Sequence, residues 1–247
     1  MKKSYYYVGL LAFIAVLVIA WGIRAETAAA GSAKVTFLSG KGFKSKSKDG
    51  PWTAIKKGSS ISAGYYVKAD TGSKIELTLP DNSKLRIAPN SVLFLSNVRL
   101  SKGTRTYDAK ILSGTVYTKA TPSKNKNDKF IVHSGGAVAG LRGTAFDIIL
   151  MPDGDTQIKC FEGKVWVATW TDYVQRAMKE APTQPTGSLE AHEVPGPGVV
   201  SEAEWVRIVD AMTSVTVGAD GKMGNPSAIA PGELSDWEEW NRQRDAM

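Results

Sequence analysis

The sequence contains a single cysteine, Cys160, among 247 residues, and this scarcity excludes an internal disulfide. The fold therefore does not depend on an oxidising compartment. Cys160 stands in the run Ile158-Lys159-Cys160-Phe161. In such a run it is expected to be a small buried residue on a strand rather than a reactive thiol.

Histidine is almost as scarce, since His133 and His192 are the two in the chain and stand 59 residues apart. Neither has a partner residue at the spacing of a metal site, so we expect no zinc, no other metal and no cofactor. A nucleophilic pair of Cys160 and His133 can be drawn, but the sequence indicates no third group to orient it.

Other catalytic patterns are missing too. The glycine-rich stretch Ser134–Gly140 lacks the strand-to-helix setting of a phosphate-binding loop, which favours tight turns and close strand packing. Strand carboxylates could still pair for glycoside hydrolysis, and Asp147 and Glu162 are the best candidates. A place beside a turn or on a solvent face explains each of them more simply. The sequence therefore predicts a protein that is not an enzyme.

Charge is absent from the stretch Tyr5–Ile23, which follows Lys2 and Lys3. Its 19 residues are long enough for a membrane-spanning helix, and aromatic residues stand at both of its ends. The alternative is a signal peptide, because Ala28-Ala29-Ala30 offers a cleavage site. Residues 1–30 are thus a signal peptide or an N-terminal membrane anchor. Positive residues stay on the cytoplasmic side, so the rest of the chain is expected in the periplasm, anchored to the bacterial inner membrane or secreted.

The net charge of +7 is unevenly distributed. Residues 31–130 carry 19 lysines and arginines against 6 acidic residues, whereas residues 131–247 carry 9 against 17. The two halves could face each other, or the lysines could simply solvate exposed strands. The third alternative is an external anionic partner, such as lipid head groups or envelope glycans. Nucleic acid is not expected, because no recognition motif is present. The lysines singled out for an anionic polymer are Lys41, Lys44, Lys46, Lys48, Lys124 and Lys126.

Between Val35 and Val167 apolar and polar residues alternate in short runs separated by Gly, Asp and Asn turns. The run Ile75–Ile87 has the same order of strand, turn and strand as the run Phe146–Phe161, about 70 residues later. Repeated units that cannot bury a face alone stack or wrap on each other. The sequence therefore predicts a mainly β fold, solenoid-like or sandwich-like.

After Val167 the pattern changes to helices and a linker. A linker with a short helix is expected over residues 169–200 and a partly helical tail over residues 201–247. Ser201 and Glu204 have the spacing of a capping box. The helix that they would open buries Trp205, Ile208, Val209 and Met212.

A final acidic helix is expected to start near Ser235 or Asp236. It carries Trp237 and Trp240, which are three residues apart and therefore share one face. The two indoles would dock the tail onto the β body; a binding platform is the alternative.

Several motifs together resemble the FecR-type domain, named after the bacterial ferric-citrate regulator. They run from Trp52 to Val167 and comprise Thr71-Gly72-Ser73, Asp81-Asn82, Pro89-Asn90-Ser91, Leu112-Ser113-Gly114, Phe130-Ile131-Val132, Leu141-Arg142-Gly143-Thr144-Ala145-Phe146, Asp153-Gly154 and Glu162-Gly163-Lys164-Val165. We therefore assign residues 34–168 to a FecR-type β domain. The resemblance implies a periplasmic, non-catalytic, solenoid-like domain that contacts other proteins. In the regulator branch a cytoplasmic segment controls a sigma factor, but only Met1–Ser4 precede the apolar stretch here, so that role is not carried over.

Arg142, between Gly140 and Gly143, is the most interesting residue of the strongest motif. Its guanidinium could hold a buried carboxylate and lock the second repeat, or it could face a partner. Arg142, Gly143 and Thr144 are therefore candidate structural or interaction residues.

Three functions follow from these observations. The first is a non-enzymatic envelope module for protein interaction or scaffolding, such as an anchored accessory subunit of a membrane complex. The second is a binding module for peptidoglycan or anionic envelope glycans, and the third a FecR-like signal sensor. The expected partners are envelope or membrane proteins, the membrane itself through Tyr5–Ile23 if this segment is uncleaved, and anionic glycans or lipids.

Overall fold

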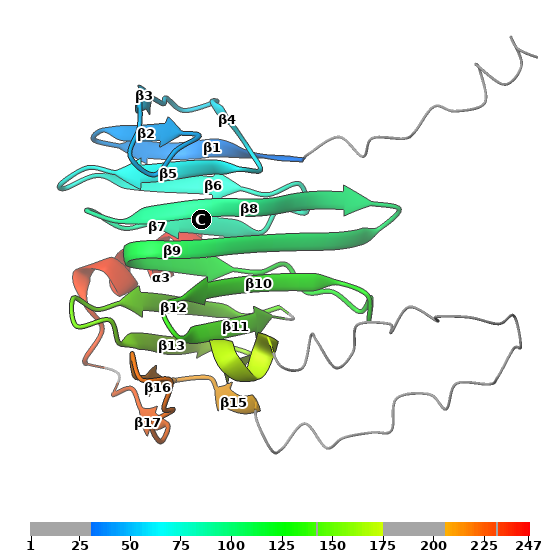
Figure 1. Cartoon of the computed structure of the whole chain (residues 1–247), viewed down its shortest axis with the longest axis vertical. Coiled ribbons are helices and arrows are strands. Elements are labelled where there is room, and N and C mark those ends of the chain that lie inside the picture. Colours follow the sequence, from blue (N-terminus) through cyan, green and yellow to red (C-terminus); the bar gives the residue numbers. More distant parts are fainter. Residues whose placement is uncertain (1–30, 142, 175–205, 231) are drawn as a thin grey trace, which may run out of the picture.

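The computed structural model describes residues 31–141, 143–174, 206–230 and 232–247 (Figure 1). Within these ranges the strands are β1 (Ser32–Ser39), β2 (Gly42–Ser45), β3 (Thr53–Ala54), β4 (Ser60–Ser62), β5 (Tyr65–Ala69), β6 (Lys74–Thr78), β7 (Lys84–Ile87), β8 (Val92–Ser101), β9 (Thr104–Lys119), β10 (Lys129–Ser134), β11 (Ala137–Leu141), β12 (Ala145–Leu150), β13 (Thr156–Glu162), β14 (Lys164–Thr169), β15 (Val206–Asp210), β16 (Thr213–Val217) and β17 (Ser227–Ala228). The helix α3 (Asp236–Asp245) follows the last strand, and residues 170–174 form a helical turn.

The described part of the chain contains no helix that is long and apolar enough to cross a membrane. The predicted membrane or signal segment, Tyr5–Ile23, lies outside the described residues.

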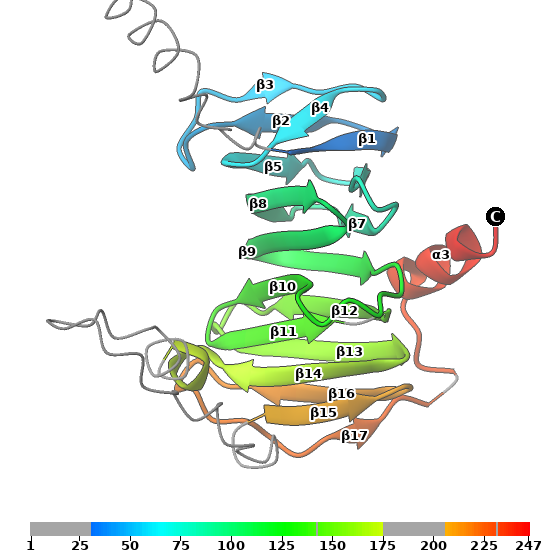
Figure 2. The same cartoon turned by 90° about the vertical axis from the view of Figure 1, so that its right-hand side faces the viewer.

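The strands form two layers that the long strand β9 joins. Layer A has the order β4–β1–β6–β7–β9–β12–β13–β16–β17. Layer B has the order β3–β2–β5–β8–β9–β10–β11–β14–β15. Every one of these pairings is antiparallel except the parallel pair of β9 and β10. From β5 onward the chain passes repeatedly from one layer to the other, so it builds one open stack that descends from β1 to β17 (Figure 2).

β9 changes layer at Gly114. Its first half pairs with β8 and β10 in layer B, and its second half pairs with β7 and β12 in layer A. Gly114 has φ +76°, and a Cβ there would lie 2.2 Å from the Ser91 Oγ. Only glycine fits this crossing point, because the backbone is left-handed and the neighbouring turn approaches closely.

The hydrophobic core lies between the layers. Alternation turns every second side chain inward, so the buried positions of each strand repeat with period two. Layer A contributes Val35, Leu77, Leu85, Val116, Phe146 and Ile158, and layer B contributes Val67, Leu93, Ile111, Val132, Ala139 and Val167. The predicted mainly β architecture is confirmed, and its layers are two faces of one open stack.

The two sequence repeats occupy equivalent places. The hairpin of β6 and β7 pairs with β9 on one side, and the hairpin of β12 and β13 pairs with β9 on the other. The repeat therefore flanks a central strand, which belongs to neither copy.

The helix predicted after Ser201 is wrong over the described residues, because residues 206–217 form two strands, β15 and β16, joined by a short turn. β15 extends layer B beside β14, and β16 extends layer A beside β13. Val209 is buried as predicted, whereas Ile208 is 51% exposed and Met212 stands in the turn with φ +57°. The spacing of these apolar residues is compatible with a helix or with a strand. The edges of β13 and β14 would otherwise be unpaired, and this favours strands. Ser201, Glu204 and Trp205 lie outside the described residues.

The final helix is confirmed at the predicted place. α3 begins after the N-cap Ser235, whose side chain accepts a hydrogen bond from the Glu238 N–H while the Glu238 carboxylate accepts one from the Ser235 N–H. This reciprocal capping box satisfies two backbone donors that would otherwise have no partner. The domain limits at residues 34–168, 169–200 and 201–247 stay a prediction, although β15–β17 continue the layers beyond residue 168.

Candidate functional site

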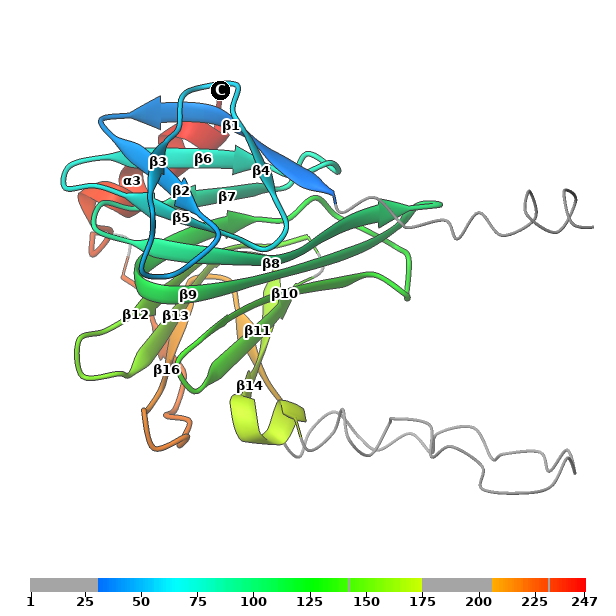
Figure 3. The same cartoon turned by 45° about the horizontal axis from the view of Figure 1, so that its top comes forward.

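The outer face of layer A carries one row of polar side chains that are direct neighbours across the strands. We call this set the charged row: Glu76, Arg86, Tyr117, Asp147 and Lys159 on β6, β7, β9, β12 and β13. Each member alternates with core residues on its own strand, so an isolated sheet would leave the row in water. The row is largely buried instead, because α3 lies across it (Figure 3).

Arg86 is the centre of the contact between α3 and layer A. Its Nε lies 2.8 Å from the Glu76 Oε2, and its Nη2 lies 2.6 Å from the Asp245 Oδ1 at the end of the helix. Its Nη1 donates to the Asn241 carbonyl oxygen at 3.1 Å. Arg244 closes the network from the helix with a 2.9 Å contact to Glu76. The guanidinium is therefore paired on both sides, which a buried cation requires.

Hydrogen bonds hold Glu76 ionised despite its burial. Burial by itself raises the pKa of this carboxyl, but donors on Arg244, Thr36 and Arg86 outweigh it and lower the pKa to about 2. The helix residue Glu238 behaves in the same way: burial raises its pKa, and Lys159 at 2.8 Å together with Ser235 lowers it below its usual range. Both carboxylates thus stabilise the docked helix as anions.

Asp147 differs from the other members of the row. It is fully buried, and burial raises its pKa to about 7. The Trp237 indole N–H donates to its Oδ1 at 3.2 Å, while Oδ2 has no hydrogen-bond partner in the described part of the chain. The expectation that Asp147 stands beside a turn or on a solvent face is wrong, because α3 covers this position.

Trp237 and Trp240 both contact the β layer. Their rings stack at 5.2 Å, and the Trp240 ring lies 5.6 Å from the Phe37 ring on β1. The Lys74 Nζ lies 4.6 Å from the centre of the Trp240 ring. These contacts agree with the docking interpretation rather than with an exposed platform.

A second buried arginine, Arg105 at the start of β9, joins three loops. Its Nη1 lies 2.7 Å from the Asp81 Oδ2 and donates to the Thr121 carbonyl oxygen at 2.6 Å, and its Nε lies 2.9 Å from the Asp128 Oδ2. Sequence reasoning missed Arg86 and Arg105. Arg86 alternates with apolar residues in its strand, which is also the pattern of an exposed arginine. Arg105 stands between two threonines, and only its phase, shared with the buried Tyr107 and Ala109, could have indicated burial.

The structure describes the motif Leu141–Phe146 except for Arg142. Arg142 lies outside the described residues, so its predicted roles stay predictions. Gly143 has φ +79°, and a Cβ there would lie 2.9 Å from the Pro122 Cα. Thr144 is buried, and its carbonyl oxygen accepts a hydrogen bond from the Ala120 N–H at 2.9 Å.

Layer B, in contrast, carries an exposed apolar cluster at its far end. We call this cluster the aromatic patch: Trp166, Trp170, Tyr173 and Ile208. The Tyr173 ring lies 6.5 Å from that of Trp166 and 5.9 Å from that of Trp170, and Ile208 is the strand neighbour of Trp166. Trp170 is 42% exposed and Ile208 51%.

Gly140 fixes the position of Trp166. A Cβ at residue 140 would lie 1.6 Å from the Trp166 Cε2, so the indole rests directly on the glycine backbone. We expect Gly140→Ala to lower the free energy of unfolding by about 1–3 kcal/mol and to alter the near-ultraviolet circular dichroism of the indole. Gly136→Ala is the control, because its nearest atom would be 3.4 Å away. Equal effects of the two substitutions would contradict this packing.

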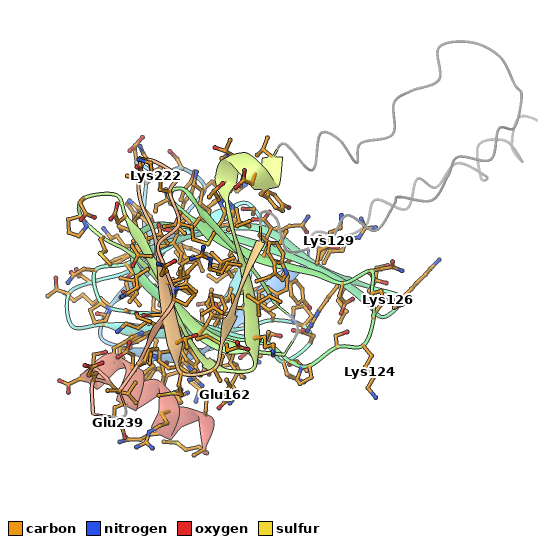
Figure 4. All side chains as sticks on the ribbon, turned by 90° about the horizontal axis from the view of Figure 1, so that it is seen from below. Lys124, Lys126, Lys129, Glu162, Lys222 and Glu239 are labelled. Carbon is orange, nitrogen blue, oxygen red and sulfur yellow. The ribbon has the colours of Figure 1, made fainter. Side chains whose placement is uncertain are left out.

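The lysines predicted to bind an anionic polymer lie in several different parts of the structure. The Lys44 Nζ donates to the Ser60 carbonyl oxygen at 2.9 Å, and the Nζ atoms of Lys44 and Lys46 lie over the Tyr65 ring at 5.3 and 5.8 Å. Lys48 lines a hollow on layer B. Lys41 stands between β1 and β2, and Lys124 and Lys126 extend from the loop between β9 and β10 (Figure 4).

The candidate catalytic residues are not brought together. Cys160 is in the core, where burial raises the pKa of its thiol to about 11, whereas His133 stacks on Trp170 outside layer B at 5.0 Å. Glu162 is exposed near Lys119, and Asp147 is buried under α3. Among the residues that the structure describes, no group of three or more histidine, cysteine or acidic residues could hold a metal ion.

Residues 65–166 match the family described as FecR protein. The chain carries a FecR domain. The match confirms the resemblance that the sequence motifs indicated, and it runs from the start of β5 into β14. α3, Trp170, Tyr173 and Ile208 lie outside this FecR domain. Two features are therefore additions to it: the helix α3, which covers layer A, and most of the aromatic patch.

Two crystal structures of "a putative anti-sigma factor" from Parabacteroides distasonis align with part of this chain. One aligns with a TM-score of 0.45 at 14% identity over 66% of this chain and 59% of the other. The second aligns with a TM-score of 0.46 at 14% identity over 70% and 63%. The chain thus spans less than two thirds of the length of these neighbours. No curated protein matches the chain.

Proposed function

We propose that this protein is a non-enzymatic interaction or scaffolding module of the cell envelope, which holds an envelope or membrane protein as an accessory subunit of a membrane complex. The aromatic patch is the observation that carries this proposal. Its members lie together at one end of layer B, remote from the face that α3 covers, and all of them except Trp166 lie outside the FecR domain.

The composition of the patch suits a protein partner. Tryptophan and tyrosine contribute most of the binding energy at many protein interfaces, because each buries a large rigid surface at a small entropic cost. Soluble surfaces rarely expose such residues in a contiguous group. Trp170 and Ile208 are two of the five most exposed large hydrophobic side chains among the described residues.

The neighbouring strand edge offers backbone contacts as well. β15 pairs with β14, and its other edge pairs with no strand of the described residues. Such an edge can accept an added strand, with backbone hydrogen bonds for affinity and side-chain pockets for specificity. A partner strand beside β15 would lie next to Ile208.

The periplasmic location and the membrane tether belong to the same proposal, and the apolar segment Tyr5–Ile23 supports them. A FecR-like signal sensor is the second candidate, favoured by the FecR domain at residues 65–166. Both functions require a protein partner, so one crosslinking experiment addresses them.

The test is site-specific photocrosslinking of the full chain in intact cells. A photoreactive residue at Ile208 should give one predominant protein adduct, and Trp170→Ala should reduce its yield about tenfold. A photoreactive residue at Leu100 is the control. Leu100 is 44% exposed on the hairpin of β8 and β9, and we expect no adduct there. Equal adducts at positions 208 and 100, or none at 208, would count against a protein partner on this patch.

A further inference from the structure

A hollow of about 600 Å³ opens on layer B between the β2–β3 loop and the centre of the layer. Its lining includes Lys48 and Trp52 from that loop, Lys68 on β5, Lys110 and Ser113 on β9, and Gly135 in the turn between β10 and β11. We call it the lysine hollow. It lies beside the aromatic patch, because Lys110 is the strand neighbour of His133, whose ring stacks on Trp170. The two sites share no residue.

The three ammonium groups of the lysine hollow have no carboxylate partner among the described residues. Lys48, Lys68 and Lys110 take part in no ion pair there. The strands of layer B contain two acidic residues, and these pair with other groups, Asp108 with His133 and Asp210 with Lys164. The hollow therefore gathers three ammonium groups that form no ion pair with a described carboxylate, although Asp49 follows Lys48 in the same loop.

An aromatic wall stands beside these charges. The Lys68 Nζ lies 5.1 Å from the centre of the Trp52 ring and 5.6 Å from that of Phe43. The indole of Trp52 is half-buried, so part of its surface remains available to a ligand. A flat ring offers a large contact area to the C–H face of a sugar, and the adjacent ammonium groups can bind a carboxylate on that sugar.

The backbone in this region argues against a peptide ligand. Near the hollow, β2 and β5, the residues Val92–Leu95 of β8 and the residues Thr106–Ile111 of β9 each lie between two paired strands, so most of their N–H and C=O groups are already used in the sheet. A peptide in the hollow would bring its own backbone donors and acceptors to a surface that offers ammonium, hydroxyl and indole groups. A ligand recognised by charge and ring stacking fits better.

We infer that the lysine hollow is a binding site for an anionic glycan whose sugars carry carboxylates. Lys48, Lys68 and Lys110 bind the carboxylates, and Trp52 stacks against a sugar ring. This site does not depend on the proposed protein contact, because Trp170 and Ile208 form no part of it. The module would then hold a glycan and a protein side by side on one layer.

The test is calorimetric titration of the full chain with an oligogalacturonate and with its methyl-esterified form, which keeps the sugar backbone but lacks the charge. We expect binding of the acid form, weaker at high salt, and none of the ester. The double substitution Lys68→Ala and Lys110→Ala should raise the dissociation constant at least about tenfold. Lys124→Ala with Lys126→Ala is the matched control: it makes the same change of charge in the β9–β10 loop and should change the constant less than about twofold.

Trp52→Ala should abolish binding and Trp52→Phe should restore part of it, which separates ring stacking from charge. Unfolding curves of each variant exclude loss of the fold as the cause. The inference fails if both lysine pairs weaken binding equally, or if the ester binds as well as the acid. Binding of poly-L-glutamate more tightly than the oligogalacturonate would assign the hollow to an acidic peptide. Binding only to anionic phospholipid vesicles would assign it to a membrane surface. Either result would overturn the inference of a glycan site. Crosslinking at Ile208 is a separate readout, so failure here leaves the proposed protein contact testable.

Discussion

Arg86→Ala should lower the free energy of unfolding by about 3–5 kcal/mol, the range found when one partner of a buried ion pair is removed. Arg86 lies between Glu76 on β6 and Asp245 on α3, with less than a twentieth of its surface exposed. Without the guanidinium the helix loses its central contact. Glu76 then keeps Arg244 and Thr36, and Asp245 keeps Lys119 and Tyr117. Urea unfolding followed by circular dichroism measures the change.

The fluorescence of the two helix indoles reports whether α3 stays docked. Arg86→Ala should expose Trp237 and Trp240 to solvent, which shifts their emission to longer wavelength. Arg242→Ala is the control on the same helix, since its partner Glu239 is on the exposed side, and it should leave stability and emission nearly unchanged. A loss of less than about 1 kcal/mol in Arg86→Ala would show that the charged row does not hold the helix.

The second large effect concerns pH. Asp147 has a pKa of about 7 in the folded protein against an ordinary value of 3.8, because burial penalises its anion more than the Trp237 indole and Lys159 favour it, and Glu238 opposes ionisation further. Between these two values the folded state binds more protons than the unfolded state. Stability is therefore lost as pH rises from about 4 to about 7, by an amount on the order of 4 kcal/mol.

Asp147→Asn should remove this loss. The variant should exceed the wild type in stability by about 1–2 kcal/mol at pH 5 and by about 4 kcal/mol at pH 8, because it cannot carry the buried charge. Glu76 acts in the opposite sense and at lower pH: its pKa of about 2 gives stability that is full above about 4.5 and lost as pH falls toward 2. Comparing variant and wild type between pH 5 and 8 therefore isolates Asp147, and parallel curves would contradict its raised pKa.

The position of α3 has a consequence for the two layers. Each outer face has polar and aromatic side chains at regular cross-strand positions, but only layer A is sealed by a helix of the described chain. The lysine hollow and the aromatic patch remain open on layer B. The interaction surfaces that we propose are thus on the face that α3 leaves free.

The sequence determined the architecture of the stack because its information is local. Period-two alternation at Ile75–Leu79, turns at Asp81-Asn82 and Asp153-Gly154, and the Ser235 capping box each depend on residues a few positions apart. The FecR motifs and the core position of Cys160 followed from the same patterns. Each of these predictions agrees with the structure or with the family match.

Only the tertiary structure decided which polar positions are buried and where the last strands lie. Glu76, Arg86 and Asp147 have the alternation of solvent-facing residues, and they are buried because a helix more than 80 residues further along the chain covers them. Ile208 and Val209 suit a helix or a strand, and the open edge of β14 made them part of the added strand β15. Lys48, Lys68 and Lys110 come from three separate segments, and the layer brings them to one hollow. Contacts between distant segments depend on how the layers stack, and local periodicity carries no record of that arrangement.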